Sequence, residues 1–351
     1  MPLDLRSTAF DISDDSPEAV FQFMADQGWS DGLPVIPPTP DRVRAMVNYV
    51  QRDATELVGY INPDAGSATV EKIAVNGVMA GCLPEYMPVL IAAVQAITEP
   101  KFNIHGLQTT TNPVSPLLII NGPVREQIGL NSKRGTLGPG YRANATIGRA
   151  VRLLLLNVGG AKPWTTDMAL HGSPAKYVCC MGENEEESIW EPLHVERGFS
   201  AVESTVTVVG AQGMSNCLTF YKEPESFLTM IASAMTDISD NNYLLAAGNP
   251  LVILTPGHAQ IFSDGGYTKQ MVKEALFELC KVPIDKFPKE TSVITYEDGF
   301  AMDGDRVCPC RSADDLMIVV SGGPEPYHAV SYTHLRAHET SLHLVCRLLL
   351  E

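Results

Sequence analysis

Cys82 is the first residue of this sequence whose position could support chemistry. It lies in the stretch NGVMAGCLPEYMPVL, between two segments whose apolar residues recur at helical spacing. Ala80 and Gly81 can end the first helix, and Pro84 suits the first turn of the next. Free N–H groups and the dipole at a helix start favour a thiolate, so we expect the pKa of Cys82 to be lowered. The alternative is a small residue buried at a helix corner.

His105 is a second candidate, for proton transfer. It lies in the stretch FNIHGLQTTTNP, which we expect to be a long loop. An imidazole exchanges protons near neutral pH, so His105 could act as an acid or base beside the Cys82 nucleophile. The alternative is a ring whose nitrogens are satisfied by the backbone.

A glycine-rich stretch, NSKRGTLGPGYRANATIGR, is a candidate anion site. It leads into a helix that we expect to begin near Tyr141 or Arg142. A glycine-rich turn that opens a helix presents free N–H groups, which bind anions. The stretch matches neither a Walker A nor a G-x-G-x-x-G pattern, so we expect a carboxylate or phosphate of a small substrate. A plain loop and helix cap is the alternative. The predicted substrate-binding residues are Gly138, Gly140, Arg142 and Asn144 here, with Thr109 and Asn121 upstream.

The acidic stretch MGENEEESIWEPLHVERG carries the third group of candidates. Glu191 and His194 could exchange protons, position a substrate or hold a divalent metal. The spacing matches no standard zinc signature, and a run of glutamates is most often a solvated face. We therefore predict no resident cofactor and keep a divalent metal as an alternative.

Composition excludes several classes of protein. The 351 residues carry a formal net charge of −16 at pH 7, which disfavours nucleic acid and anionic membranes as partners. No apolar run reaches the ~18 residues of a membrane span, and the first residues lack an apolar signal core. The cysteines are scattered, as is typical of free thiols rather than of a disulfide framework. We expect a cytoplasmic protein.

The elements expected between these motifs indicate an α/β fold. Residues Ser204–Gly210 and Leu316–Ser321 are short apolar runs, typical of buried strands with helices on both faces of a layered sheet. We expect an N-terminal arm over residues 1–40, a first α/β half over 41–200 that carries the site, and a second half over 201–329.

The two halves show signs of an internal duplication. Each contains a helix, a loop and an apolar strand, Pro116–Ile120 in the first and Pro250–Leu254 in the second. A Gly-Tyr pair follows each strand, at Gly140-Tyr141 and at Gly266-Tyr267. We therefore expect two pseudo-symmetric halves, with chance similarity of two helix–strand units as the alternative. The first copy has the longer loops, so we expect it to carry the function.

The last residues, VSYTHLRAHETSLHLVCRLLLE, resemble the translation of a sequencing-library adapter. We expect residues 330–351 to be a non-native tail and the natural chain to continue differently from about residue 330. Such a tail should be exposed or only loosely docked. Its deletion should change the free energy of unfolding by no more than about 0.5 kcal/mol.

Five strings resemble one bacterial family. They are DGLPVIPPT, MAGCLPEY, NIHGLQTTTNPVSPLLIINGP, GPGYRANATIGRA and ENEEESIWEPLHVERG, and together they cover most of residues 25–330. This family is loosely associated with the small UGSC-motif thioredoxin-like selenoproteins. The chain has no UGSC or CGSC string. If the resemblance implies thiol chemistry, Cys82 is the position that carries it.

The sequence therefore predicts a cysteine-dependent oxidoreductase or lyase that acts on a small anionic metabolite, with Cys82 and His105 as its reacting groups. One alternative is a metal-assisted hydrolase or lyase built on His194 and the nearby glutamates. Another is a non-catalytic subunit that binds a small molecule. A homo-oligomer and a redox partner protein are further expectations.

Overall fold

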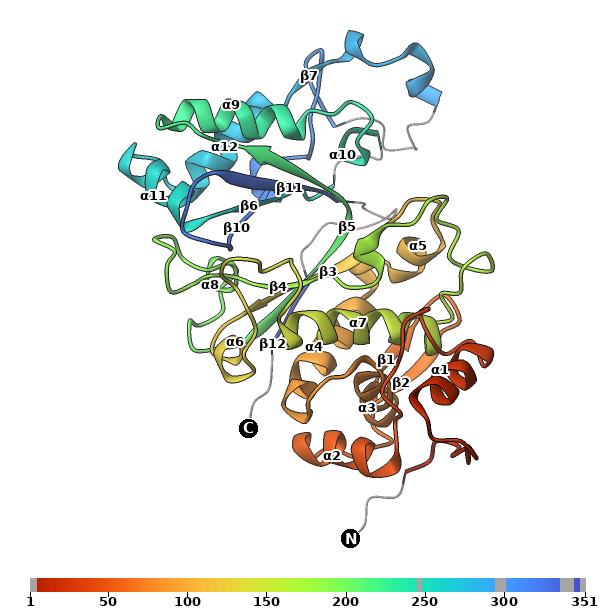
Figure 1. The fold of residues 1–351 in the computed structure, drawn as a ribbon. Helices are drawn as coiled ribbons and strands as arrows, with labels where there is room; N and C mark the ends of the chain where they lie inside the picture. Colours follow the sequence, from red (N-terminus) through yellow and green to blue (C-terminus); the bar gives the residue numbers. More distant parts are fainter. Residues whose placement is uncertain (1–4, 245–247, 294–300, 335–343, 348–351) are drawn as a thin grey trace.

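One mixed sheet, built from strands of both halves of the chain, organises the fold (Figure 1). The computed structural model describes residues 5–244, 248–293, 301–334 and 344–347. The first half extends past the predicted boundary at residue 200 to the end of β5. With the N-terminal arm, its elements are α1 Pro17–Asp26, α2 Pro40–Val50, β1 Leu57–Ile61, β2 Gly66–Thr69, α3 Val70–Ala80, α4 Met87–Thr98, α5 Ile104–Thr109, β3 Ser115–Asn121, α6 Val124–Gln127, α7 Arg142–Asn157, β4 Cys180–Gly182, α8 Leu193–Glu196 and β5 Thr205–Leu218.

The second half repeats the order of helices and sheet strands. Its elements are α9 Pro224–Met235, α10 Asn241–Leu244, β6 Leu251–Leu254, α11 Pro256–Asp264, α12 Lys269–Leu279, β7 Val282–Pro283, β8 Met302–Asp303, β9 Arg306–Val307, β10 Met317–Val320, β11 His328–His334 and β12 Leu344–Arg347. Strands β7, β9 and β8 form a small separate sheet.

The two sides of the large sheet have equivalent strand arrangements, related by an axis between β11 and β5. The strands run β10-β6-β11-β5-β3-β4, with β12 paired to the start of β5. β3 lies parallel to β4, β6 lies parallel to β10, and every other neighbouring pair is antiparallel. Along the chain, each half therefore contributes first the second strand, then the edge strand and then the centre strand of its side of the sheet. The prediction that Pro116–Ile120 and Pro250–Leu254 occupy equivalent places is confirmed in topology, since β3 and β6 are these strands.

The sheet curls until its two edges meet. The Asn184 N–H, just past β4, donates to Val320 O of β10 at 2.8 Å, and the Ser321 hydroxyl donates to Gly182 O at 2.7 Å. The inner face is filled by alternate strand residues, as the two-residue period of a strand requires. This inner cluster comprises Leu117, Ile119, Cys179, Met181, Leu193, Val209, Ala211, Leu251, Ile253, Met317, Val319 and Tyr332.

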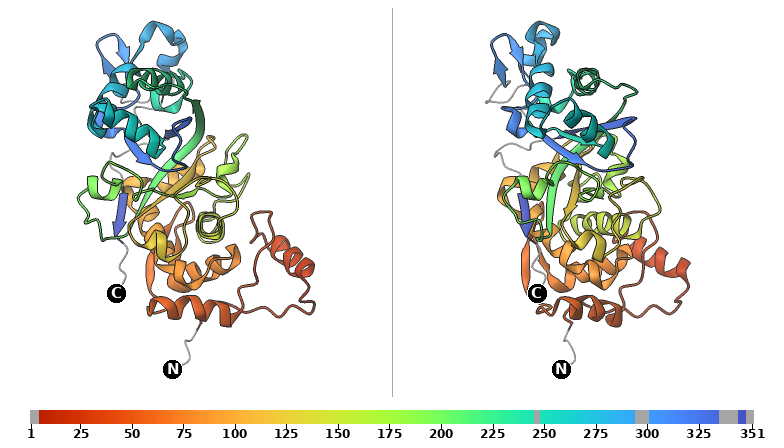
Figure 2. Two further views of the ribbon diagram at one scale, coloured as in Figure 1. Left: turned by 60° about the vertical axis from the view of Figure 1, so that its left-hand side comes forward. Right: turned by 90° about the vertical axis from the view of Figure 1, so that its left-hand side faces the viewer.

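Helices flank the curled sheet from two sides (Figures 1 and 2). α3, α4 and α7 pack on the outward residues of β3 and β5, and α9, α11 and α12 pack on those of β6 and β10. The two helical layers form separate apolar clusters, one for each half. The predicted α/β class, with a sheet between helical layers, is confirmed. No helix of the described residues is both long enough and apolar enough to cross a membrane.

The N-terminal arm packs on α7. Arg149 of α7 donates to both carboxylate oxygens of Asp31, at 2.9 and 2.7 Å, and Asn157 donates to Trp29 O. The Arg149–Asp31 pair is largely buried. The arm is therefore fixed by a bidentate ion pair, a geometry that holds both partners in place.

The expectation of an exposed tail is wrong for its first residues. β11 lies between β5 and β6, and both Ser331 and Tyr332 are buried in the sheet. Val330 and Tyr332 suit this place because β-branched and aromatic residues favour strands. Deletion from Ser331 onward would leave β5 and β6 without a shared neighbour, so we expect it to destabilise by clearly more than about 0.5 kcal/mol. Residues 335–343 and 348–351 of the predicted tail lie outside the described residues.

A buried histidine holds the second half together at the start of α11. The Thr255 N–H donates to His258 Nδ1, and His258 Nε2 lies 2.8 Å from the Thr219 hydroxyl. That hydroxyl donates to Pro326 O, so Nε2 carries the ring proton and Nδ1 accepts. Protonation of Nδ1 would break the bond from the Thr255 N–H, and the Thr255 hydroxyl, 2.8 Å from Nδ1, would have to accept the ring proton instead. Burial, joined by the charge of His328, lowers the pKa of His258 to about 4.

We expect this histidine to make the fold sensitive to acid. Its folded pKa lies below the unfolded value of 6.5, so the unfolded chain binds the proton more readily. The stability is complete above pH ~6.5 and is lost as the pH falls towards 4, by about 3 kcal/mol. Urea unfolding of the wild type and His258→Gln between pH 4 and 8 measures it. If the free energy of unfolding depends on pH equally in the two proteins, the assignment is contradicted.

Candidate functional site

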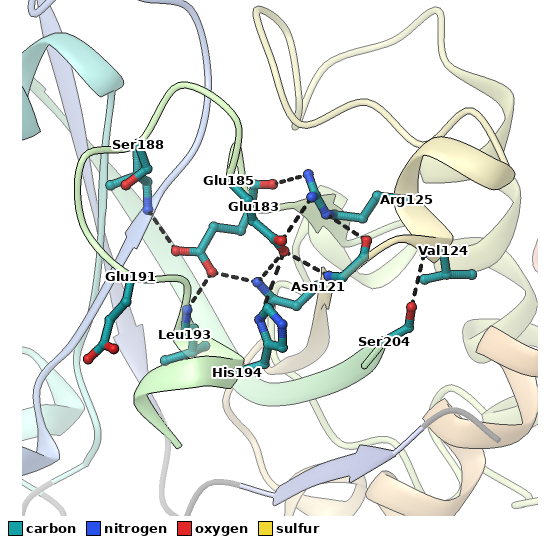
Figure 3. Close-up of polar contacts among 12 residues, drawn as sticks. Asn121, Val124, Arg125, Glu183, Glu185, Ser188, Glu191, Leu193, His194 and Ser204 are labelled. Carbon is teal, nitrogen blue, oxygen red and sulfur yellow. Dashed lines mark hydrogen bonds and ion pairs between the residues drawn. The ribbon is translucent and has the colours of Figure 1, made fainter. Parts of the chain in front are cut away.

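The carboxyl ends of β3 and β4 bring together a cluster of buried polar side chains. Asn121 is the last residue of β3, and Glu183 follows β4 directly; both are fully buried. The Asn121 amide donates to Glu183 Oε2 at 2.6 Å and to Glu185 Oε1 at 2.9 Å. Carboxyl ends of parallel strands are where ligands bind in open α/β sheets. Figure 3 shows this group, which we call the carboxylate cluster.

Arg125, on α6, fixes the carboxylates of this cluster. Its side chain is buried, and its guanidinium donates to Glu183 O at 2.6 Å and to Gly122 O at 3.1 Å. It also pairs with Glu185 at 3.0 Å and with Glu186 at 2.7 Å. The planar guanidinium of Arg125, whose donors have a fixed geometry, therefore holds the turn after β4 in place.

Gly122 makes the tight turn between β3 and α6 possible. Its φ of +82° lies in the left-handed region, and a Cβ there would meet Glu203 O at 2.2 Å. The Gly122 N–H donates to Glu185 Oε1 at 2.7 Å. The Val124 N–H donates to the Ser204 hydroxyl at 3.0 Å. The turn therefore packs directly against the segment that precedes β5.

His194, the second residue of α8, lies under the cluster with no hydrogen-bond partner on either ring nitrogen. Its ring is fully buried, and Nδ1 lies 3.9 Å from Glu185 Oε1. The Ala201 carbonyl is near the ring but outside hydrogen-bonding geometry. Burial lowers the pKa of His194, although the Glu185 carboxylate acts in the opposite direction. The ring is therefore a neutral imidazole with both nitrogens available.

Burial favours the protonated form of the Glu183 carboxyl group. Burial raises its pKa, against the opposing effects of Lys269 and of the donors from Leu193 and Asn121. Those two donors both reach Oε2, at 2.8 and 2.6 Å. Oε1 receives only a long contact of 3.5 Å from the Val320 N–H. Oε1 is therefore the oxygen with capacity to bind or release a proton.

Further buried polar atoms near these groups also lack partners. They are Asn121 Oδ1 and the hydroxyls of Thr205 and Thr207. Asn121 pairs with Thr205, and Ile119 with Thr207, across β3 and β5, so these groups share the inner face with the cluster. Buried polar atoms without partners are rare in native proteins, and several together indicate that a water or a small polar ligand completes the site.

The predicted residues of the acidic stretch are only partly brought together. His194 joins the cluster as expected, but Glu191 is exposed, and its side chain points away from the other carboxylates in Figure 3. Asn121, predicted to bind substrate, lies at the centre. The residues that sequence reasoning did not select are Arg125, Glu183, Glu185 and Ser204. Glu183 and Ser204 carried a signal, a polar residue next to the end of a buried strand, whereas Arg125 and Glu185 carried none.

The glycine-rich loop does not form the predicted anion site. Gly138 and Gly140 are exposed, and the Arg142 guanidinium donates to Gly81 O at 3.0 and 2.9 Å. Asn144 is buried and hydrogen-bonds the loop itself, at Asn131 and Thr136. Asn144 therefore holds the loop on α7, and Arg142 ties α7 to the end of α3. The alternative of a structural loop and helix cap is the one the contacts support.

Cys82 is buried, and its environment opposes the predicted thiolate. Burial raises the pKa of the Cys82 thiol to about 12, and contacts with Thr146 and Arg142 lower it only in part. Residues Pro84–Tyr86 form a 3₁₀ turn that continues directly into α4 at Met87, so Cys82 does lie just before a helical segment, as expected. The prediction of a lowered pKa is nevertheless wrong, because desolvation outweighs any helix-end effect.

We accordingly expect Cys82 to behave as a packing residue. Its thiol should react with iodoacetamide at pH 7 slowly in the native protein and quickly only after unfolding, because the thiolate is the nucleophile. Mass spectrometry of labelled peptides measures this rate, with Cys217 as the internal comparison. Cys82→Ala should keep any catalytic activity within about twofold, since a catalytic nucleophile would lose several orders of magnitude. Fast native labelling of Cys82 would contradict the assignment.

His105 lies on α5 rather than on the predicted loop, and its side chain is exposed. Thr109 closes the same short helix and donates to His105 O at 3.0 Å. Within residues 5–244, no hydrogen bond or ion pair joins His105 to Cys82 or to the carboxylate cluster. The structure therefore does not bring the predicted nucleophile and base together.

The described residues contain no group of three or more His, Cys, Asp or Glu side chains arranged to hold a metal ion. A scan against protein-family models found no match for this chain, and a search of curated proteins found no similar relative. The geometry of the carboxylate cluster is therefore what indicates a function.

Proposed function

We propose that this chain is an acid–base enzyme, a hydrolase or lyase, that acts on a small polar molecule at the carboxylate cluster. One observation carries the proposal: a fully buried, neutral His194 with both ring nitrogens unpartnered lies 3.9 Å from Glu185 and beside the buried acid Glu183. Titratable groups whose environments shift their pKa values in a buried site are the usual acid and base of an enzyme.

The groups suit complementary roles. His194 is the candidate base, because a neutral imidazole accepts a proton and Glu185 would stabilise the imidazolium that forms. Glu183 is the candidate acid, since burial favours its protonated form and Oε1 has no short partner. The free Oδ1 of Asn121 and the Thr205 hydroxyl would orient the substrate. Arg125 acts as a positioning residue that holds Glu185 and Glu186.

The thiol-dependent mechanism that the family resemblance suggests has less support. Cys82 is buried, its pKa is raised, and Arg142 beside it is bonded to the backbone. A redox partner protein has no role in the proposed reaction. The cytoplasmic location, the exclusion of nucleic acid and a homo-oligomeric state remain predictions from composition.

A substrate screen in D₂O tests the proposal. Purified protein is incubated with a panel of small hydroxy, keto and amino acids, amides and esters, and ¹H NMR follows each mixture. Exchange of a C–H for deuterium reports proton abstraction, while loss of substrate reports hydrolysis or elimination. Parallel samples with Mg²⁺ or Zn²⁺ test the metal-assisted alternative. Turnover that is unchanged in both His194→Gln and Glu183→Gln would overturn the proposal.

A further inference from the structure

Two buried lysines of the second half reach the first half beside the carboxylate cluster. Lys269 is the first residue of α12 and Lys273 lies one turn further along, so both side chains lie on the same face of the helix. These side chains are only 9% and 5% exposed. A lysine is almost never buried to this degree unless it is paired. The acid–base chemistry proposed above uses neither of them.

Both lysines pair with one carboxylate, that of Glu196. Lys269 Nζ lies 2.6 Å from Glu196 Oε2, and Lys273 forms an ion pair with Oε1. Lys269 also donates to Glu191 O at 3.2 Å. Glu196 is the last residue of α8, and Glu191 comes two residues before its first. Lys269 therefore holds the α8 segment at both ends, whereas Lys273 holds it at one end.

The place of α8 depends on such contacts with the rest of the fold. The helix has only four residues, and isolated helices this short are not stable in water. It nevertheless carries His194, and the Leu193 N–H donates to Glu183 Oε2 at 2.8 Å (Figure 3). A displacement of α8 would therefore move the candidate base and remove a donor from the candidate acid at the same time.

Lys269 also acts on the candidate acid through its charge. Burial raises the pKa of Glu183, and the positive charge of Lys269 opposes this rise more than the donors from Leu193 and Asn121 do, while Glu185 adds to it. Lys273 is not among the groups with the largest effects on Glu183. The two lysines therefore share an ion-pair partner but differ in their influence on the site.

We propose that Lys269 is a positioning residue of the acid–base centre, which the second half supplies to hold α8, and with it His194, against Glu183. The inference rests on the proposed function and extends it, because the centre then requires both halves of the chain. Lys273 has the simpler role of completing the ion pair of Glu196.

Titration of the Glu183 carboxyl group by ¹³C NMR tests the inference, in protein made with ¹³C-labelled glutamate. Glu183→Gln identifies the resonance. Lys269→Gln should raise the pKa of Glu183 by at least about 0.5, because it removes the neighbouring positive charge. Lys269→Met, which fills the same buried volume without a charge, should have the same effect, and Lys269→Arg should restore the wild-type value.

Lys273→Gln is the matched control, because it removes a lysine from the same helix and the same ion pair. It should change the pKa of Glu183 by less than about 0.2. Hydrogen exchange of the Leu193 N–H gives a second readout and should become at least tenfold faster in Lys269→Gln, since α8 is then held at neither end by this lysine. Circular dichroism checks that each variant is folded.

A lysine with a purely structural role would give a different result. Lys269→Gln and Lys273→Gln would then lower Tm alike and leave the pKa of Glu183 unchanged. Equal pKa changes in the two variants would also overturn the inference, as would a Glu183 that releases no proton below the pH of unfolding. None of these measurements needs a substrate, so a screen that finds no turnover would contradict the proposed function without affecting them.

Discussion

His194→Gln is expected to lower kcat/KM by 10²–10⁴-fold, the usual contribution of a general base. The matched substitution His105→Gln should leave kcat/KM within about twofold, because His105 is exposed on α5 and lies outside the carboxylate cluster. The same assay thus compares two histidines that the sequence alone could not rank. A large loss in His105→Gln and none in His194→Gln would reverse the assignment.

The pH profile gives a second and independent readout. The base must be neutral to accept a proton, and burial lowers the pKa of His194 below its ordinary value of 6.5. The wild-type kcat/KM should therefore rise with pH on the acid side of 6.5 as His194 loses its proton, and fall again at the higher pH at which the Glu183 acid ionises, because burial raises the pKa of Glu183. His194→Gln should lose this acid limb along with the rate.

Stability should change in the opposite direction to activity. His194→Phe replaces a ring with two unpartnered nitrogens by an apolar ring, so we expect Tm to be unchanged or higher. A histidine with a purely structural role would not combine lost activity with retained stability. A clear fall in Tm would indicate that the ring makes bonds on which the fold depends.

The architecture was predictable from the sequence because short apolar runs and turns repeat. The strands at Pro116–Ile120 and Pro250–Leu254 and the helix at Val70–Met79 follow from periodicity alone. The curl of the sheet could not be predicted, since it depends on contacts such as that from Asn184 to Val320, across 136 residues. The burial of Tyr332 could not be predicted either, because the composition of the tail does not show that the tail pairs with β5 and β6.

The site was predictable only in part, for a physical reason. Asn121 and His194 were identified by residue type and neighbourhood, and both lie in the cluster. Cys82 was misjudged because a helix-end argument considers one favourable effect, whereas burial is a property of the whole fold. Arg125 gave no sequence signal. Its importance comes from three backbone and side-chain partners near residues 183–186, about 60 positions away.

The two halves differ in how completely their buried polar groups are satisfied. In the second half, His258 has a partner on each nitrogen, from Thr255 and Thr219. In the first half, His194 has none, and Asn121 Oδ1 is also unpartnered. A histidine whose ring nitrogens are hydrogen-bonded contributes to stability, whereas a buried histidine without partners is available to bind a ligand. This difference supports the prediction that the first copy carries the function.

Arg125→Met is expected to lower the free energy of unfolding by about 3–5 kcal/mol, the cost of removing one partner from a buried ion pair. Its guanidinium is almost fully enclosed and serves Glu185, Glu186 and two backbone carbonyls. Without it, Glu185 and Glu186 would lose their direct ion-pair partner and their carboxylates would lie close together with only the more distant Lys133 and Lys269 nearby. Urea unfolding at pH 7 measures the loss, which should depend little on salt because the pair is buried.

Two comparisons separate this effect from a general loss of a surface charge. Arg134→Met removes an exposed arginine that pairs with Glu325, and it should cost no more than about 1 kcal/mol. Adding Glu185→Gln to Arg125→Met should recover part of the loss, since it removes one of the stranded charges. A cost for Arg125→Met close to that for Arg134→Met would mean that water or another cation already neutralises the cluster. The acid–base geometry proposed for Glu185 and His194 would then lose the residue that positions it.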